Sequence, residues 1–240
     1  MPTGDDVTVV VPTLEERASF ELLAPRLQRA LAPFVAEVIV VDDDSRDRID
    51  ELVGRLASPP RFRAVVRRGV RGLASAVVAG IREARGTVVV VMDADGSHPP
   101  EILPQLIGPI LEDRADFVLA SRGAPGGAAP GLHGGRRLIS WGATRLARPL
   151  TRVSDPMSGY FAVRRTLIDP DRLAPLGYKI ALELLVKCRP PRVVEVPFVF
   201  GERLAGTSKL DRGQMAAYVR HVLRLYAWRF GRAAVARSTR

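Results

Sequence analysis

The sequence predicts an α/β domain in which one mostly parallel sheet carries helices on both faces. Short runs rich in valine and isoleucine alternate with segments of helical spacing through the first half of the 240-residue chain, as in parallel α/β folds. Three of these runs end directly in polar clusters, where sheets of this kind bind their ligands. No internal repeat and no linker divides the chain into independent domains.

The first five strands and the four helices between them follow one another in alternation. We expect strands at residues 7–11, 37–41, 62–66, 88–92 and 116–120, and helices at residues 17–32, 47–56, 73–84 and 99–111. Apolar residues recur every three or four positions in the first helix. Gly86 follows the third helix as a C-terminal cap, and Pro99 and Pro100 suit the first turn of the fourth.

The second half of the chain has a looser pattern. Residues 123–135 are rich in glycine, alanine and proline, which predicts a mobile loop. Beyond it we expect a helix at 138–147, a strand near 160–163, a helix at 180–187 and a pair of strands at 193–200.

A last helix, expected at residues 212–230, is basic and amphipathic. Arg220, Arg224 and Arg229 lie around an apolar stripe made of Met215, Val219, Val222, Tyr226 and Phe230. Such a helix packs its stripe on the domain, lies on an anionic membrane, or does both. We therefore divide the chain into a main domain at 1–210 and a C-terminal basic helix and tail at 211–240.

The composition limits the chemistry that the chain can carry. Its single cysteine, Cys188, excludes an intramolecular disulfide, and with only three scattered histidines it also excludes a Cys/His zinc cluster. Any metal must therefore be held by carboxylates. The net charge of +10 suits nucleic acid, an anionic membrane or phosphorylated substrates.

The sequence shows no targeting or membrane-spanning segment. Residues 1–6 are polar and acidic, unlike a signal peptide. The longest apolar runs have the length of strands, whereas a spanning helix needs about 18 or more apolar residues. We expect a soluble or peripheral protein.

Polar clusters at residues 12–16, 42–45 and 93–97 each follow an expected strand, so they should meet at the carboxyl edge of the sheet. In the third, Asp93 and Asp95 are two residues apart in an extended segment. Both carboxylates can reach Mg²⁺ or Mn²⁺, which share their ligands with substrate phosphates. An isolated pair of this kind is more often a solvated turn, so the surrounding sequence must decide.

Residues 93–101, DADGSHPPE, closely resemble the DADLQHPPE run of the dolichol-phosphate mannosyltransferases, which are family 2 glycosyltransferases with a Rossmann-like GT-A fold. The resemblance spans roughly residues 7–225. Its other landmarks occur in the family order: PTLEER at 12–17, VDDDS at 41–45, RGLASAV at 71–77, SR at 121–122, DPMSGYF at 155–161 and FGERLAGTSKL at 200–210.

The resemblance implies a metal-dependent, inverting transfer of mannose from GDP-mannose to a dolichyl or polyprenyl phosphate. Asp93, Asp95 and Ser97 would hold Mg²⁺ or Mn²⁺, with Ser97 in place of a family glutamine. The donor-binding residues would be Pro12, Leu14, Glu16, Val41, Asp43, Asp93, Ala94, Asp95, Lys179, Arg203 and Lys209. Leu14 and Glu15 replace a tyrosine and an asparagine of the family, which leaves UDP-glucose or another hexose donor open.

On the acceptor side, the resemblance assigns the lipid phosphate to Arg122, Arg136, Arg137 and Ser140. Asp95, Arg122 and Arg203 are the expected catalytic residues. The phosphate oxygen is already anionic, so a general base is unnecessary and orientation matters more. Arginine suits this task because its planar fork donates two parallel hydrogen bonds. Glu183, one turn after Lys179, faces the same cleft or is an ordinary helix charge.

Two other classes of function remain as alternatives. A nucleotidyltransferase would show a Gly- and Lys-rich loop near the first strand, and residues 12–17 contain neither. A non-enzymatic module that binds a membrane or nucleic acid explains the charge but not the acidic clusters. We expect no nucleic-acid partner. The expected partners are a membrane surface, at its cytoplasmic face, and a small membrane-anchoring protein.

Overall fold

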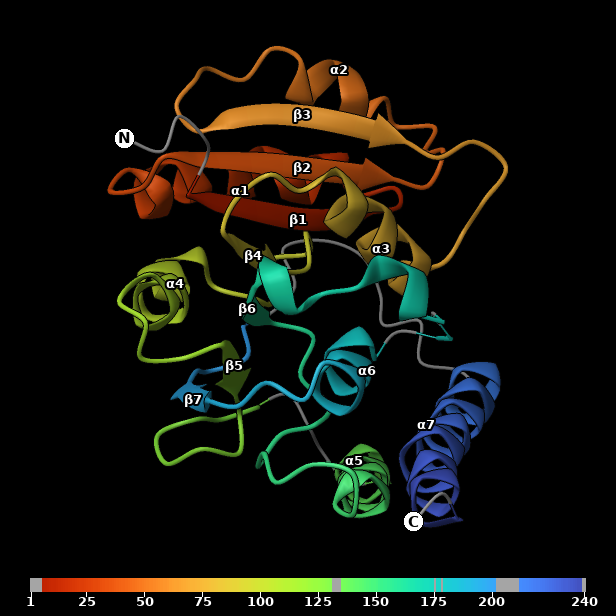
Figure 1. Cartoon of the computed structure of the whole chain (residues 1–240). Helices are drawn as coiled ribbons and strands as arrows, with labels where there is room; N and C mark the ends of the chain where they lie inside the picture. The colour runs from red at the N-terminus through yellow and green to blue at the C-terminus, as the bar shows by residue number, and fades with distance from the viewer. Residues whose placement is uncertain (1–5, 131–134, 175, 178, 202–211, 239–240) are drawn as a thin grey trace.

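The computed structural model describes residues 6–130, 135–174, 176–177, 179–201 and 212–238, with only the backbone of 135–140, 212 and 232–238. Its centre is a seven-stranded sheet of order β3-β2-β1-β4-β6-β5-β7 (Figure 1). Six of the strands are parallel, and β6 runs antiparallel between β4 and β5. The expected mostly parallel α/β fold is confirmed. The strands are β1 (Val7–Thr13), β2 (Ala36–Asp42), β3 (Arg61–Val66), β4 (Val88–Val91), β5 (Phe117–Ser121), β6 (Phe161–Arg164) and β7 (Val193–Pro197).

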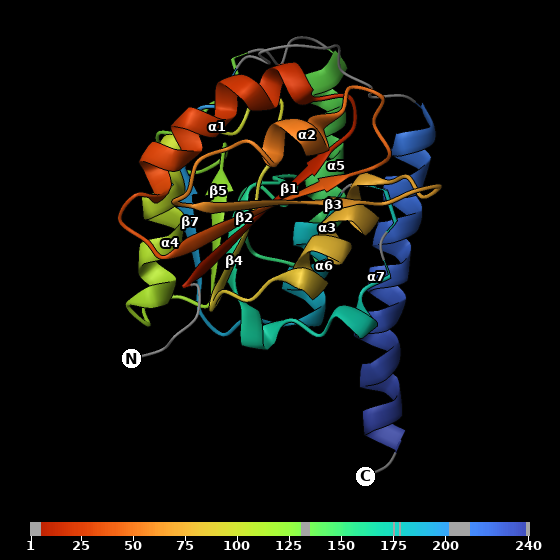
Figure 2. The same ribbon diagram turned by 90° about the horizontal axis from the view of Figure 1, so that it is seen from above.

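Helices cover both faces of this sheet. Apolar residues of α1, α2 and α4 form one core with the strands, and those of α3 and α6 form another; Figure 2 shows α1 and α4 on one side of the strands and α3 and α6 on the other. The helices are α1 (Arg17–Leu31), α2 (Ile49–Val53), α3 (Leu73–Glu83), α4 (Leu103–Leu111), α5 (Gly135–Ala147), α6 (Ile180–Lys187) and α7 (Arg212–Ser238), with short 3-10 turns at Pro100–Ile102, Arg165–Leu167 and Pro170–Arg172.

The segment after β7 differs from the expected pair of strands. A single strand, β7, pairs in parallel with β5, and Val199 then bridges to Ala128. The Ala128 amide donates to the Phe198 carbonyl at 3.0 Å, and the Phe200 amide donates to the Ala128 carbonyl at 2.8 Å. The glycine-rich segment that we expected to be a mobile loop is therefore tied to the sheet at Ala128, while 131–134 lie outside the described residues.

Helix α7 packs against α5 and α6 through a third apolar cluster. Its buried face contains Tyr218, Val222 and Leu225, and the Tyr218 hydroxyl donates to the Ala143 carbonyl of α5 at 2.8 Å. Of the expected stripe, Val219 and Phe230 are instead 40% and 50% exposed. A stripe spaced mostly by four residues drifts around a helix of 3.6 residues per turn, so its members cannot all meet one partner. In the described part of the chain, no helix is long and apolar enough to span a membrane.

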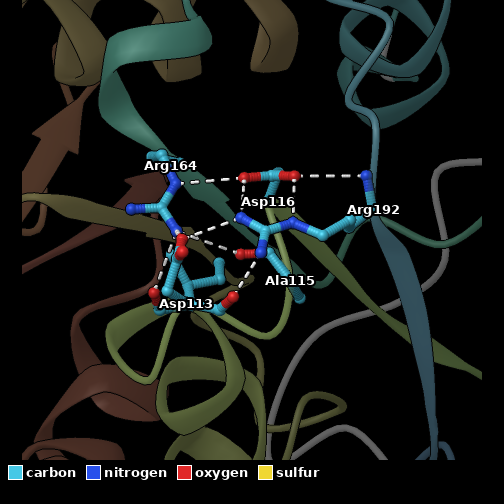
Figure 3. A network of polar contacts seen from close by, with 6 residues as sticks. Asp113, Ala115, Asp116, Arg164 and Arg192 are labelled. Carbon is cyan, nitrogen blue, oxygen red and sulfur yellow. Dashed lines mark hydrogen bonds and ion pairs between the residues drawn. The ribbon is translucent and has the colours of Figure 1, made fainter.

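An ion-pair network far from the carboxyl edge joins β5, β6 and β7 (Figure 3). Asp116, whose side chain is 6% exposed, accepts from Arg164 at 3.1 Å and from Arg192 at 2.9 Å. The hydrogen bond from Arg192 is the largest contribution that lowers the pKa of Asp116 to about 2. Asp113, 74% exposed, touches the same two arginines. Asp116 thus fastens the starts of β5 and β7 to the end of β6.

Replacing Asp116 by asparagine is expected to lower the free energy of unfolding by about 1–3 kcal/mol near neutral pH, because the two arginines lose a charged acceptor. The folded-state pKa is depressed, so this stabilisation is present above the ordinary aspartate value of 3.8 and is lost as the pH falls towards about 2. Urea unfolding at several pH values would measure it. Asp113→Asn is the control and should unfold at nearly the wild-type urea concentration, because Asp113 is 74% exposed and its ion pairs are screened by water; equal losses in the two variants would contradict this account.

Candidate active site

A cavity of about 790 Å³ opens at the carboxyl ends of the parallel strands. The register aligns Thr13 of β1 with Asp42 of β2, and Val10 with Val91 of β4, so the polar residues that follow the three strands emerge at one edge. The predicted residues that line the cavity are Pro12, Leu14, Glu16, Asp43, Asp93, Ala94, Asp95, Arg122 and Lys179.

Asp95 is held in place by the residue that we predicted as a further metal ligand. Its Oδ1 accepts from the Ser97 amide at 3.0 Å and from the Ser97 hydroxyl at 2.6 Å, and Asp95 is only 7% exposed. Gly96 between them has a φ of 85°, which glycine adopts without strain. Ser97 therefore orients the carboxylate; its role as a ligand stays a prediction.

Asp93 is fixed from the other side by His98. The Asp93 amide donates to His98 Nδ1 at 2.9 Å, and the imidazole stacks on Tyr160 with ring centroids 4.8 Å apart. Burial lowers the pKa of His98, so the ring is a neutral acceptor at physiological pH. The side chain of Asp93 itself is 36% exposed. The loop thus presents one partly exposed and one buried carboxylate to the same cavity.

Arg122 and Asp155 form a bidentate ion pair on another wall. Arg122 Nε and Nη2 donate to the two carboxylate oxygens of Asp155 at 2.7 and 2.9 Å, and the guanidinium lies 5.5 Å from the Phe200 ring. Burial acts to raise the pKa of Asp155, but the hydrogen bonds from Arg122 outweigh it and hold that pKa below its usual value. Because Nε and one N–H of Nη2 are engaged by Asp155, an anion would meet the outer edge formed by Nη1 and the second N–H of Nη2.

Lys179 belongs to the same electrostatic group. Lys179 directly precedes α6, and its Nζ donates to the Met157 carbonyl. Burial and the charge of Arg122 lower the pKa of Lys179 to about 8, and Asp155 and Asp93 partly oppose them. The charges of Arg122, Lys179, Asp93 and Asp155 therefore influence one another at the cavity.

Asp43 lines the cavity with both oxygens already bonded. Arg67 Nε donates to Oδ1 and the Gly72 amide to Oδ2, each at 2.7 Å. Gly72 has a φ of 146° and precedes α3. Asp43 therefore joins the end of β2 to the start of α3, and a ligand would share it with these donors.

Val41 does not line the cavity, and five other predicted residues lie outside the described side chains. Val41 is fully buried in the core below α3, so its side chain does not reach a nucleotide sugar in the cavity. Arg203 and Lys209 lie outside the described residues. Arg136, Arg137 and Ser140 are in the first part of α5, residues 135–140, of which only the backbone is described.

Several lining residues were missed by the sequence analysis. Phe198 and Phe200 contribute an aromatic wall, and Gly177 and Gln214 close the side near α6 and α7. The alternating phenylalanines after β7 were the available signal for the first two. The sequence contains no signal for Gln214, because a helical pattern does not specify which end of α7 lies at a cavity.

Comparisons with known proteins agree with this arrangement. A family model described as glycosyl transferase family 2 matches residues 8–170. The chain is 43% identical over 226 residues to a dolichol-phosphate mannosyltransferase of Pyrococcus furiosus, covering 92% of this chain but 64% of that protein, less than two thirds of its length. It is 42% identical over 239 residues to the Saccharomyces cerevisiae dolichol-phosphate mannosyltransferase, with 94% and 89% covered.

A solved structure shares the fold. Glucosyl-3-phosphoglycerate synthase from Mycobacterium tuberculosis, in complex with Mn²⁺, UDP-glucose and phosphoglyceric acid, superposes with a TM-score of 0.67 at 25% identity. The match covers 95% of this chain and 80% of that one.

Proposed function

The chain belongs to glycosyl transferase family 2, and from this premise we propose that it transfers mannose from GDP-mannose to a polyprenyl phosphate. The product would be a β-linked polyprenyl-phosphate mannose, formed by a single displacement with inversion. The observation that supports this most is that one cavity presents the carboxylates of Asp93 and Asp95 together with the cations of Arg122 and Lys179. Two phosphorylated substrates and a cation need such a combination.

The residues present fit a divalent metal, Mg²⁺ or Mn²⁺. Asp95 and Asp93 would hold it from one loop. Among the described residues no group of three or more His, Cys, Asp or Glu side chains converges on a metal position, which suits an ion that completes its shell with water and substrate phosphate. When bound, the cation would stabilise the negative charge that develops on the leaving diphosphate. The Mn²⁺ in the M. tuberculosis complex is in line with this proposal.

The protein's own groups would bind and orient the two substrates. Pro12, Leu14, Glu16 and Asp43 lie on the side where the nucleoside would sit, and Val41 could contribute only backbone. Arg122 would meet the acceptor phosphate through Nη1 while Asp155 keeps its fork in place. Fixed charges of this kind act without reorganising during the reaction. The donor contacts of Arg203 and Lys209, and the phosphate contacts of Arg136, Arg137 and Ser140, remain part of the proposal.

Proton transfer to the enzyme plays no part in the proposed step. The attacking phosphate oxygen is already an anion, and His98 in the cavity is neutral and engaged by the Asp93 amide. The new bond forms between that oxygen and the anomeric carbon as the bond to the nucleoside diphosphate breaks.

Labelled GDP-mannose and UDP-glucose, each incubated with polyprenyl phosphate with and without Mn²⁺, test the function. We expect label in the organic phase from GDP-mannose, dependent on the metal. UDP-glucose is the second candidate donor, since it is bound in the M. tuberculosis structure and since Leu14 and Glu15 depart from the family. Label from neither donor would refute the transferase proposal.

We also propose that α7 lies on an anionic membrane where the lipid acceptor enters, at the cytoplasmic face, either unaided or with a small anchoring protein. Val219, Leu223 and Phe230 are 40%, 59% and 50% exposed and form one stripe at helical spacing. Exposed Arg220 and Arg224 lie beside it. An apolar stripe flanked by arginines complements an interface of acyl chains and anionic headgroups.

Leu223→Glu is expected to weaken binding to vesicles that contain anionic phospholipid by about tenfold or more, since burial of a leucine contributes about 1.5–3 kcal/mol. Co-sedimentation with the vesicles would measure it. Leu22 on α1 is also 59% exposed, so Leu22→Glu is a matched control that should bind like the wild type. Equal binding by all three proteins would exclude α7 as the docking element.

A further inference from the structure

A buried polar cluster lies behind the cavity, between α6 and α7. Glu183 is 1% exposed and His221 2%. Glu183 Oε1 accepts from Lys187 Nζ at 2.5 Å and from the Ala174 amide at 2.8 Å. Its other oxygen, Oε2, faces His221 Nε2 at 4.0 Å. The sequence allows Glu183 to be either a cleft residue or an ordinary helix charge, and the structure turns its carboxylate towards α7.

Glu183 Oε2 and His221 Nε2 face each other and can pair through a hydrogen bond. Within the described residues, neither Glu183 Oε2 nor His221 Nε2 has a hydrogen bond, and both are buried. Buried polar atoms are rarely left unpaired, and a small side-chain rotation would close 4.0 Å to hydrogen-bonding distance. The pair is therefore placed to form a polar link across an otherwise apolar helix contact.

The same face of α7 reaches the cavity. Gln214 lines it beside Gly177 and Lys179. A Cβ on Gly177 would lie 3.6 Å from the Ala217 Cβ, and His221 donates a hydrogen bond to the Lys179 backbone carbonyl. Gln214, Ala217 and His221 are spaced three and four residues apart, which places them on one side of the helix. The first turns of α7 thus lie against the segment that carries Lys179 into the cavity.

We propose that His221 and Glu183 are positioning residues that tie α7 to the start of α6 and so set Lys179 against the donor's diphosphate. Lys179 is at the junction between the cavity and α6, and His221 contacts its backbone while Glu183 holds His221 from within α6. This inference rests on the proposed function, because it takes a nucleoside-diphosphate sugar as the ligand of Lys179.

The charge state of the link follows from its surroundings. Burial lowers the pKa of His221, with Lys187 and Arg224 acting in the same direction, while Glu183 and the Lys179 backbone oppose them. A neutral imidazole carries one N–H, so hydrogen bonds to both the Lys179 carbonyl and Glu183 Oε2 need one further proton, shared by the buried His221–Glu183 pair. A substitution that keeps a side-chain donor should preserve the link, and an apolar one should not.

Variants of His221 test the proposal in the full-length protein. His221→Leu is expected to raise the KM and the Kd for the donor by about tenfold to a hundredfold, with the KM for the polyprenyl phosphate unchanged. His221→Gln should recover most of the affinity for the donor. Glu183→Gln should give a donor Kd between those of the wild type and His221→Leu. Titration calorimetry with GDP-mannose, UDP-glucose and Mn²⁺ gives the Kd without depending on turnover.

Tyr218→Phe is the control, because it removes a bond between α7 and α5 without touching Lys179. It should lower the Tm but leave the donor Kd at the wild-type value. A donor Kd for His221→Leu equal to that of Tyr218→Phe would overturn the positioning role. If His221→Leu does not fold, wild-type donor affinity in Glu183→Leu would overturn it. A wild-type protein that binds neither donor would refute the proposed function as well.

Discussion

Asp95→Asn is expected to reduce sugar transfer by at least about a thousandfold. Metal stabilisation of a leaving group contributes several kcal/mol, and each 1.4 kcal/mol corresponds to about a factor of ten in rate. Asparagine keeps the shape of the side chain and can still accept from the Ser97 amide and hydroxyl, which hold Asp95 at 3.0 and 2.6 Å. The loss would therefore reflect the missing charge. Initial rates over a range of Mn²⁺ concentrations measure it.

Asp44→Asn is the matched control for this substitution. Asp44 follows another strand, is exposed and has a φ of 61°, which asparagine tolerates. Its variant should transfer sugar like the wild type and melt at the same temperature. Unchanged turnover in Asp95→Asn would remove the metal role from this residue.

Replacement of Arg122 by glutamine is expected to lower transfer by about a hundredfold to a thousandfold, the range found when a fixed donor to developing charge is removed. The effect should appear in the KM for the lipid phosphate as well as in kcat, because Arg122 Nη1 is the proposed phosphate contact. The same change leaves Asp155, 6% exposed, as an uncompensated buried charge, which is destabilising. Activity and stability must therefore be separated.

The double variant Arg122→Gln with Asp155→Asn makes that separation. It removes both charges, keeps the volume at position 155 and should recover much of the Tm lost in the single variant. Transfer should stay low, because the phosphate contact is still absent. Recovery of activity together with stability would show that Arg122 acts only as a structural partner of Asp155. Full-length proteins assayed at saturating GDP-mannose, with the lipid phosphate varied, give the comparison.

The sequence was most informative where structure is local. The β-branched runs and the spacing of apolar residues in the helices placed the first five strands and four helices to within a few residues. Carboxylates that directly follow a parallel strand must emerge at the carboxyl edge of the sheet, so the sequence alone assigns Asp43, Asp93 and Asp95 to one site. Motif order added Arg122 and Lys179, which line the same cavity.

Pairings between distant segments could not be predicted in this way. Arg122 meets Asp155 across 33 positions of the chain, and β6 enters between β4 and β5 with the opposite direction. Neither follows from propensity or periodicity. Nothing in the sequence around His221 distinguishes it from a surface histidine, yet the structure buries it against Glu183.

By itself, the sequence determined which segments form strands and helices and which carboxylates end the strands, because backbone preference and apolar periodicity act over a few residues. The tertiary structure alone decided that Ser97 turns onto Asp95, that Val41 points into the core and that α7 reaches the cavity through Gln214. Those outcomes depend on how helices and strands pack. The sequence of a single helix or strand does not specify which neighbour will cover each of its faces.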